Sequence, residues 1–115
     1  MSELEHLRDQ LRSFAAERDW DQFHSPKNLA SALSVEAAEL LEKFQWLTEA
    51  QSLQLTPAAL EEVRSEVADV LLYLIRLSDK LGIDLIAAAN AKLILNAQKY
   101  PVAKAFDTSK KYTEL

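Results

Sequence analysis

The sequence has no cysteine, one glycine and three prolines among its 115 residues. Without cysteine, the chain can form neither a disulfide nor a thiolate metal site, and it has no cysteine nucleophile. This composition fits a reducing compartment. The scarcity of glycine and proline leaves few of the residues that the turns of a β-sheet need, so we predict an all-α fold.

The chain also lacks an excess of positive charge and a long apolar run. Its net charge is −5 and its pI is near 5.0, which argues against broad electrostatic binding to nucleic acid or to an anionic membrane. The most apolar run, Val67 to Leu77, includes Asp69 and Arg76 and is about half as long as the roughly 20 residues of a membrane-spanning helix. The N-terminal residues are too charged for a secretory signal. We therefore expect a cytoplasmic protein without nucleic-acid or membrane partners.

The apolar periodicity predicts four helices in a single domain of residues 1–115. Two serine or threonine residues followed by proline, Ser25-Pro26 and Thr56-Pro57, are typical of helix starts. Gly82 indicates a helix end and Asp84 a new start. The predicted helices cover residues 3–17, 26 to about 48, 57 to about 81 and about 84–99, and the third is apolar on so many sides that we expect it to be buried in the bundle or by a partner subunit.

Two pairs of acidic residues interrupt the apolar stripes of the second and third predicted helices. Glu36 and Glu39 lie three residues apart, as do Glu66 and Asp69, so the members of each pair share a helical face. Isolated buried carboxylates are costly and tend to bind a proton. We therefore predict that they bind a divalent cation such as Mg²⁺, which accepts carboxylates together with substrate phosphates. In the alternative interpretation, the acids face solvent or pair with basic side chains, namely Lys43, Arg64 and Arg76.

Polar and aromatic residues elsewhere are candidates for ligand contacts. Lys92, Asn96 and Lys99 form one line along the fourth predicted helix and could hold phosphate oxygens, or they could be a solvated face. Aromatic side chains could stack on a base or belong to the core or an interface; they are Trp20, Phe23, Trp46 and Tyr73. His24 has no second histidine at metal-ligand spacing, so we predict a structural or surface role for it.

Around the acidic pairs the sequence resembles the MazG-like all-α nucleoside triphosphate pyrophosphohydrolases, and the dCTP pyrophosphatases in particular. The pairs match the E-x-x-E and E-x-x-D motifs of that family. The flanking resemblance extends over nearly the whole chain and comprises residues 14–24, 44–46 and 69–74, Lys92 with Asn96, residues 99–101 and residues 111–115. The sequence departs from close relatives at Leu11, where they carry a histidine that helps to line the base pocket.

The resemblance implies a four-helix MazG-like bundle and homodimers that pair into homotetramers. It also implies a Mg²⁺-dependent reaction that converts a dNTP to dNMP and pyrophosphate, with dCTP or a modified dCTP as the preferred substrate. It implies metal binding and catalysis by Glu36, Glu39, Glu66 and Asp69, nucleoside contacts from Trp20, Trp46 and Tyr73, and phosphate contacts from Lys92, Asn96 and Lys99. On this hypothesis, water attacks the α-phosphorus of a metal-bound triphosphate.

Two alternatives to a dCTP pyrophosphatase remain open at this point. One is a house-cleaning hydrolase with a broad preference for non-standard dNTPs. The other is a non-catalytic helical module that dimerises through the heptad-like apolar stripe from Leu60 to Leu81. The second alternative explains the apolar helix but gives no reason for the two acids within it.

Overall fold

The computed structural model describes all residues 1–115 and confirms the all-α prediction, since it contains helices and no strand. The four long helices are α1 (Glu3–Glu17), α2 (Pro26–Glu42), α4 (Pro57–Lys80) and α5 (Leu85–Lys99). The short elements are the 3-10 helices η1 (Asp21–Phe23) and η2 (Tyr112–Glu114) and the one-turn helices α3 (Glu49–Ser52) and α6 (Val102–Ala105). Every helix is too short or too polar to cross a lipid bilayer.

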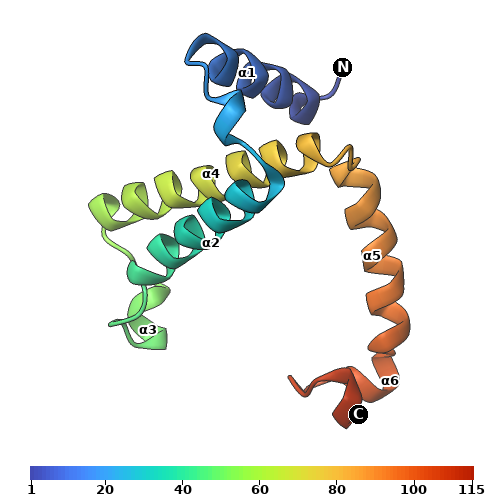
Figure 1. The fold of residues 1–115 in the computed structure, drawn as a ribbon. Helices are drawn as coiled ribbons and strands as arrows, with labels where there is room; N and C mark the ends of the chain where they lie inside the picture. Colours follow the sequence, from blue (N-terminus) through green and yellow to red (C-terminus); the bar gives the residue numbers. More distant parts are fainter. The chain divides into compact units, whose positions relative to one another are not determined.

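Contacts within the chain define two compact units, Met1–Gly82 and Ile83–Leu115. In the first unit, α2 and α4 lie side by side and run in opposite directions, with α3 at the turn that joins them (Figure 1). Helix α1 also packs against α4. The second unit consists of α5, α6 and η2. The two acidic pairs therefore lie on two helices that pack directly against each other.

The predicted helix boundaries are set by local capping. The side chains of Ser25, Thr56 and Asp84 each accept a hydrogen bond from the backbone N–H three residues later, as N-caps do. Gly82 follows the last turn of α4 with a φ of 66°, a left-handed conformation that glycine adopts without steric cost. These contacts confirm the predicted starts of α2, α4 and α5 and the predicted end of α4.

The predicted end of the second helix is wrong, because α2 stops at Glu42 and not near Thr48. After Glu42 the chain forms turns, in which two successive N–H groups donate to the carbonyl of Leu41. Thr48 is itself the N-cap of α3, where its side chain and that of Gln51 form a reciprocal capping box. The apolar spacing therefore continued beyond the helix into the turns. The short helices α3 and α6 and the turn η2 were also not predicted.

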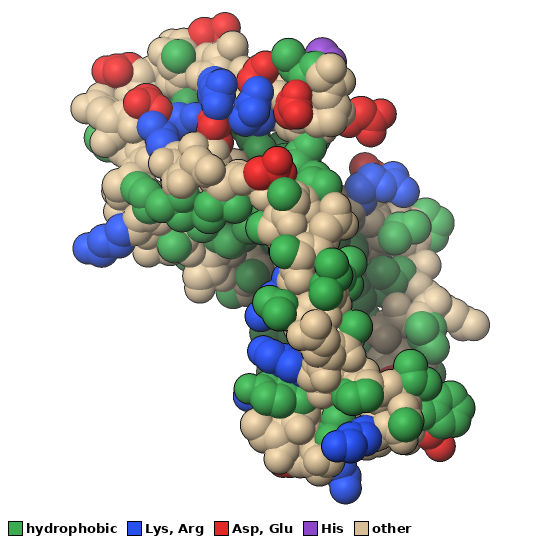
Figure 2. Space-filling model, turned by 90° about the vertical axis from the view of Figure 1, so that its right-hand side faces the viewer, with side chains coloured by type: hydrophobic (Ala, Val, Ile, Leu, Met, Phe, Trp, Pro, Cys, Tyr) green, Lys and Arg blue, Asp and Glu red, His purple; other side chains and the backbone are tan.

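The buried apolar core of one chain is small and contains Ala15, Leu29 and Ile75. Helix α4 also contributes the buried polar residues Arg76 and Ser78. Many large apolar side chains remain at the surface, and Figure 2 shows hydrophobic patches between acidic and basic side chains on the face that it draws. On α4 the exposed apolar residues include Leu60, Val67 and Leu71, so a single chain covers this helix only in part.

Candidate functional site

Three of the four predicted acids come together between α2 and α4. Glu36 and Glu39 lie one turn apart on α2, and Glu66 lies opposite them on α4. One carboxylate oxygen from each lies within 4.8 Å of the other two, and all three residues are half-buried. We call these three residues the carboxylate cluster. Asp69 lies one turn further along α4, outside this cluster, but its charge contributes to the raised pKa of Glu36.

The carboxylate cluster is electrostatically unfavourable without a positive group. Burial, followed by the close carboxylate of Glu39, raises the pKa of Glu36 to about 7. Burial, followed by the negative charge of Glu39, also raises the pKa of Glu66. In addition, Oε2 of Glu36 and Oε2 of Glu66 are buried and have no hydrogen-bond partner. Unpartnered buried polar atoms are uncommon in folded proteins and costly, which indicates that something else satisfies these oxygens.

The basic side chains that were candidates for neutralising the acids have other partners. None of the three forms an ion pair with the carboxylate cluster or with Asp69, so the interpretation based on internal salt bridges is wrong, although the charge of Lys43 offsets part of the rise in the pKa of Glu66. The observed pairs are Arg64 with Glu61 at 2.5 Å, Arg76 with Asp21 at 2.7 Å and Lys43 with Glu62 at 3.8 Å.

The carboxylate cluster fits a hard divalent cation. Carboxylate oxygens are the ligands that Mg²⁺ and Ca²⁺ prefer, and three such groups converge here from two helices. A cation would give the two unpartnered buried oxygens a ligand to bind and would replace repulsion between the carboxylates with attraction. Glu36, Glu39 and Glu66 are therefore the residues that would hold it.

The metal-free protein is expected to become more stable as the pH falls through 7. The pKa of Glu36 is about 7 in the folded chain and near the ordinary value of 4.5 when unfolded, so the folded state takes up a proton first and the free energy of unfolding rises. Glu36→Gln removes this proton uptake and should raise the melting temperature more at pH 8 than at pH 5, in the range where the carboxylate titrates. Thermal melts of the parent protein and of Glu36→Gln in the presence of a chelator test this prediction. The other titrating groups are the same in both proteins, so identical pH profiles of the melting temperature would contradict it.

An apolar pocket of about 470 Å³ lies beside Asp69 in the first unit. Its walls come from α1, from the segment that follows α1, and from α4. Phe14 and Trp20 meet edge to face with ring centres 5.7 Å apart, and the rings of Trp20 and His24 meet in the same way at 6.4 Å. A pocket of this size and aromatic character suits a flat ring such as a nucleobase.

The predicted nucleoside contacts have different positions in the structure. Trp20 and Tyr73 line the pocket together with Asp69, so the structure brings these three predicted residues together. Trp46 is 86% exposed in the turn after α2 and does not line the pocket. The three predicted phosphate contacts lie on α5 in the second compact unit, with the two lysines exposed and the asparagine half-buried; they are Lys92, Asn96 and Lys99.

Sequence reasoning missed several residues of the pocket. Phe14 follows the helical period of α1 and was assigned only to the packing face of that helix. Arg76 was considered only as a partner of the acids, and His24 only as a structural or surface residue. All three line the pocket. The stretch from residue 18 to residue 24 held the available signal for His24, because it combines aromatic and charged residues without a helical period.

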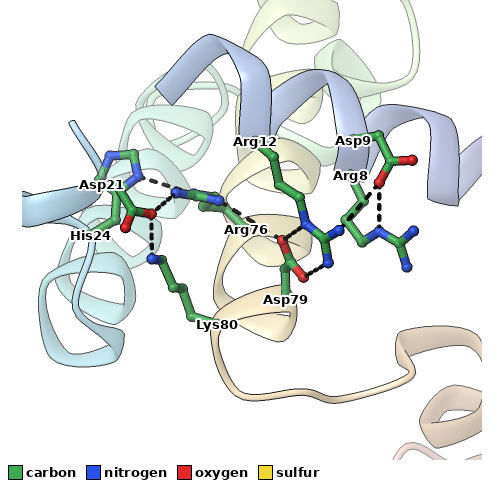
Figure 3. A network of polar contacts seen from close by, with 8 residues as sticks. All are labelled: Arg8, Asp9, Arg12, Asp21, His24, Arg76, Asp79 and Lys80. Carbon is green, nitrogen blue, oxygen red and sulfur yellow. Dashed lines mark hydrogen bonds and ion pairs between the residues drawn. The ribbon is translucent and has the colours of Figure 1, made fainter. Parts of the chain in front are cut away.

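Arg76 holds the segment after α1 against α4. Its side chain is only 7% exposed, and it donates through Nε to His24 Nδ1 at 3.1 Å and through Nη2 to Asp21 at 2.7 Å (Figure 3). Lys80, one turn further along α4, donates to the same carboxylate of Asp21. These cations lower the pKa of Asp21, with the hydrogen bond from Lys80 as the largest cause. Two cations on α4 therefore fix the position of η1.

The same network continues from α4 to α1. Asp79 accepts two hydrogen bonds from Arg12, at 2.7 Å and 2.5 Å, and lies 3.8 Å from Arg76 (Figure 3). The hydrogen bond from Arg12 is the largest cause of the lowered pKa of Asp79. The network thus connects the three parts of the chain that line the pocket.

The fold and the site define a helical protein that can bind a hard cation next to a pocket for a flat ring. The sequence profile of the MazG-like family matches residues 31–115. The chain belongs to the MazG-like family, as its motifs predicted.

Individual relatives agree with this assignment. The chain is 42% identical over 114 residues to dCTP pyrophosphatase 1 from Homo sapiens, a match that covers 97% of this chain and 67% of the relative. It is 39% identical over 114 residues to dCTP pyrophosphatase 1 from Bos taurus, covering 97% and 68%. Among solved structures, it is similar to the crystal structure of a pyrophosphatase from Archaeoglobus fulgidus DSM 4304, with a TM-score of 0.83 and 42% identity over 88% of this chain and 94% of the other. The protein is thus a homologue of pyrophosphatases.

Proposed function

We propose that this chain is a Mg²⁺-dependent nucleotide pyrophosphohydrolase that converts a dNTP, with dCTP or a modified dCTP preferred, to dNMP and pyrophosphate. The observation that carries this proposal is the carboxylate cluster, with its two unpartnered buried oxygens, on two helices beside an aromatic pocket. The names of the relatives supply the substrate, because dCTP pyrophosphatases share about two-fifths of their aligned residues with this chain.

The carboxylate cluster requires a cation before it can accept a triphosphate, which carries about four negative charges. Mg²⁺ held by the cluster, with Asp69 as a fourth proposed ligand, would supply the positive charge that binds phosphate oxygens. Water adds to the α-phosphorus, and the bond from this phosphorus to the oxygen that bridges to the β-phosphate breaks. Pyrophosphate leaves with the electron pair of that bond. A carboxylate of the site accepts the proton that the water loses.

The pocket is the proposed site for the base. Asp69 lines the pocket and lies three residues from Glu66 of the carboxylate cluster, so a base between the aromatic walls leaves the phosphates on the side of the cluster. Trp20 and Tyr73 are then the proposed nucleoside contacts. The apolar lining excludes water from the faces of the ring, which strengthens stacking.

A panel of dNTPs assayed with Mg²⁺, with pyrophosphate resolved from phosphate, tests the proposed reaction. Preferential hydrolysis of dCTP or 5-methyl-dCTP with release of pyrophosphate is expected. A flat profile over standard and modified pyrimidine and purine dNTPs would favour the house-cleaning alternative, and release of phosphate would contradict the reaction. If the assembled protein neither hydrolyses nor binds any nucleotide in Mg²⁺, the non-catalytic module is favoured.

Trp20→Ala is expected to raise the KM for dCTP about tenfold or more, because stacking of a base on an aromatic ring contributes roughly 1–3 kcal/mol. Trp20→Phe keeps an aromatic face and should stay within about threefold of the parent. Steady-state kinetics of both variants, with melting curves to verify folding, provide the measurement. An unchanged KM in a folded Trp20→Ala protein would show that the base binds elsewhere.

We further infer that residues 1–115 act as one domain and that the protein is a homo-oligomer, a dimer or a pair of dimers. The family match includes parts of both compact units. Large apolar side chains on α4 and α5 are exposed in one chain, as is typical of surfaces that pack against another copy. Light scattering is expected to give the mass of a dimer or tetramer, and a monomer would contradict this inference. In the assembly, the remaining proposed nucleotide contacts would be Trp46, Lys92, Asn96 and Lys99.

A further inference from the structure

His24 occupies a position in the pocket that its structural role alone does not require. It is half-buried and lines the pocket together with Trp20 and Asp69. Its ring packs edge to face against Trp20, at an interplanar angle of 62°. One side of the imidazole is therefore held by the protein, and the ring borders the space that the proposed function assigns to the base.

Arg76 determines which nitrogen of His24 carries the proton. Nδ1 of His24 accepts a hydrogen bond from Nε of Arg76 at 3.1 Å. A guanidinium remains protonated and can only donate, so this nitrogen must be unprotonated. The imidazole is then neutral and carries its hydrogen on Nε2. Burial, together with the positive charges of Arg76 and Lys80, lowers the pKa of His24, which agrees with a neutral ring.

The Nε2–H group of His24 is left as a free donor. The bond to Arg76 is the only hydrogen bond that the ring makes in the chain, and Figure 3 shows its second nitrogen turned away from Arg76. The guanidinium of Arg76 is directed at other partners, since Nη2 donates to Asp21 and Nη1 lies 3.8 Å from the carboxylate of Asp79. The mostly apolar wall of the pocket thus includes an imidazole donor of fixed tautomer, in addition to the side chains of Gln10, Trp20 and Tyr73, which also carry donors.

We propose that His24 is a specificity-determining residue that donates a hydrogen bond from Nε2–H to N3 of a cytosine base. This inference rests on the proposed function. Cytosine N3 is an acceptor, whereas N3 of uracil and thymine carries a hydrogen and would face the donor of His24 with a second donor. A buried donor left without an acceptor loses its hydrogen bond and keeps its desolvation cost, which disfavours the uracil and thymine nucleotides.

The test compares dCTP with 3-deaza-dCTP, in which N3 is replaced by C–H and the acceptor is lost. The kcat/KM of the parent protein should be at least about tenfold higher for dCTP than for 3-deaza-dCTP, as expected when one hydrogen bond is lost in a site that excludes water. His24→Asn is the informative variant. The amide oxygen of the asparagine is bonded to Cγ, as Nδ1 is in histidine, so this oxygen can still accept the hydrogen bond from Arg76. The asparagine side chain has no group at the position of Nε2. His6→Asn, at an exposed position on α1, is the matched control.

The ratio of the two kcat/KM values separates this inference from a purely structural role. We expect His24→Asn to reduce the ratio to about one while its melting temperature stays near that of the parent, and His6→Asn to keep the parent ratio. If His24 only supports the fold, both substrates lose activity equally, the ratio stays unchanged, and the inference is overturned. A parent protein that hydrolyses both analogues equally well also overturns it, although the proposed function stands. A parent protein inactive on every dNTP overturns the proposed function itself.

Discussion

Glu39→Gln is expected to lower the turnover of dCTP in Mg²⁺ by about 100-fold or more. Glu39 contributes to the carboxylate cluster from α2 and lies within 4.8 Å of both other acids. An amide keeps the size of the side chain but removes the charge that holds a cation, and a loss of about 3 kcal/mol in the transition state corresponds to roughly 100-fold in rate. Steady-state kinetics at saturating Mg²⁺ and nucleotide provide the measurement.

The control for this substitution is Glu61→Gln, which neutralises an acid of the same type on α4. Glu61 is 69% exposed and pairs only with Arg64, so its loss should change turnover less than twofold, in line with the small effects of exposed pairs. Asp69→Asn extends the test to the proposed ligand outside the carboxylate cluster. Normal turnover of either Glu39→Gln or Asp69→Asn with Mg²⁺ would contradict the four-acid site.

Arg76→Met is expected to lower the free energy of unfolding by about 3 kcal/mol, near the lower end of the range for breaking a buried ion pair. The guanidinium is 7% exposed and Asp79 is 12% exposed, but Asp21 is 62% exposed and can be rehydrated, which limits the loss. The substitution also removes the hydrogen bond that ties His24 to α4 and leaves Asp21 of η1 with Lys80 alone, so the KM for dCTP should rise. Urea denaturation and steady-state kinetics measure the two effects.

Arg64→Met is the matched control for Arg76→Met, because both arginines lie on α4 and each pairs with one carboxylate at close distance. Arg64 is 66% exposed, and its replacement should change stability by less than about 1 kcal/mol. Equal losses of unfolding free energy in the two variants would mean that the burial of Arg76 does not increase its contribution to stability. A stable Arg76→Met protein with an unchanged KM would show that the pocket does not depend on the network.

The carboxylate cluster and the ion-pair network have opposite effects on the metal-free fold. The cluster places three acids together and leaves two buried oxygens unpartnered, so it weakens the fold until a cation binds. The network joins α1, η1 and α4 through paired charges. Functional sites often break the rules of stability that the rest of the chain obeys. The two acidic motifs are such a case, because they interrupt stripes that are otherwise apolar.

The sequence by itself determined where the four long helices begin and which residues form the acidic motifs. Proline after Ser25 and Thr56, and Gly82 after the last apolar position of its stripe, act within a few residues, so their effects can be read locally. The three-residue spacing of Glu36 and Glu39 likewise places both on one helical face wherever the helix packs. The spacing failed at the end of α2, because turns can continue an apolar pattern without continuing the helix.

Only the tertiary structure decided which residues meet across the chain. The packing of α2 against α4 brings Glu66 to the pair on α2, and no spacing within either helix indicates which turns face each other. Arg76 contacts His24 across 52 residues of sequence, and this contact gives the histidine its tautomer and its place in the pocket. A charged residue in an apolar stripe can form its hydrogen bonds and ion pairs with any neighbouring element. Its role therefore depends on tertiary contacts that the spacing of the stripe does not predict.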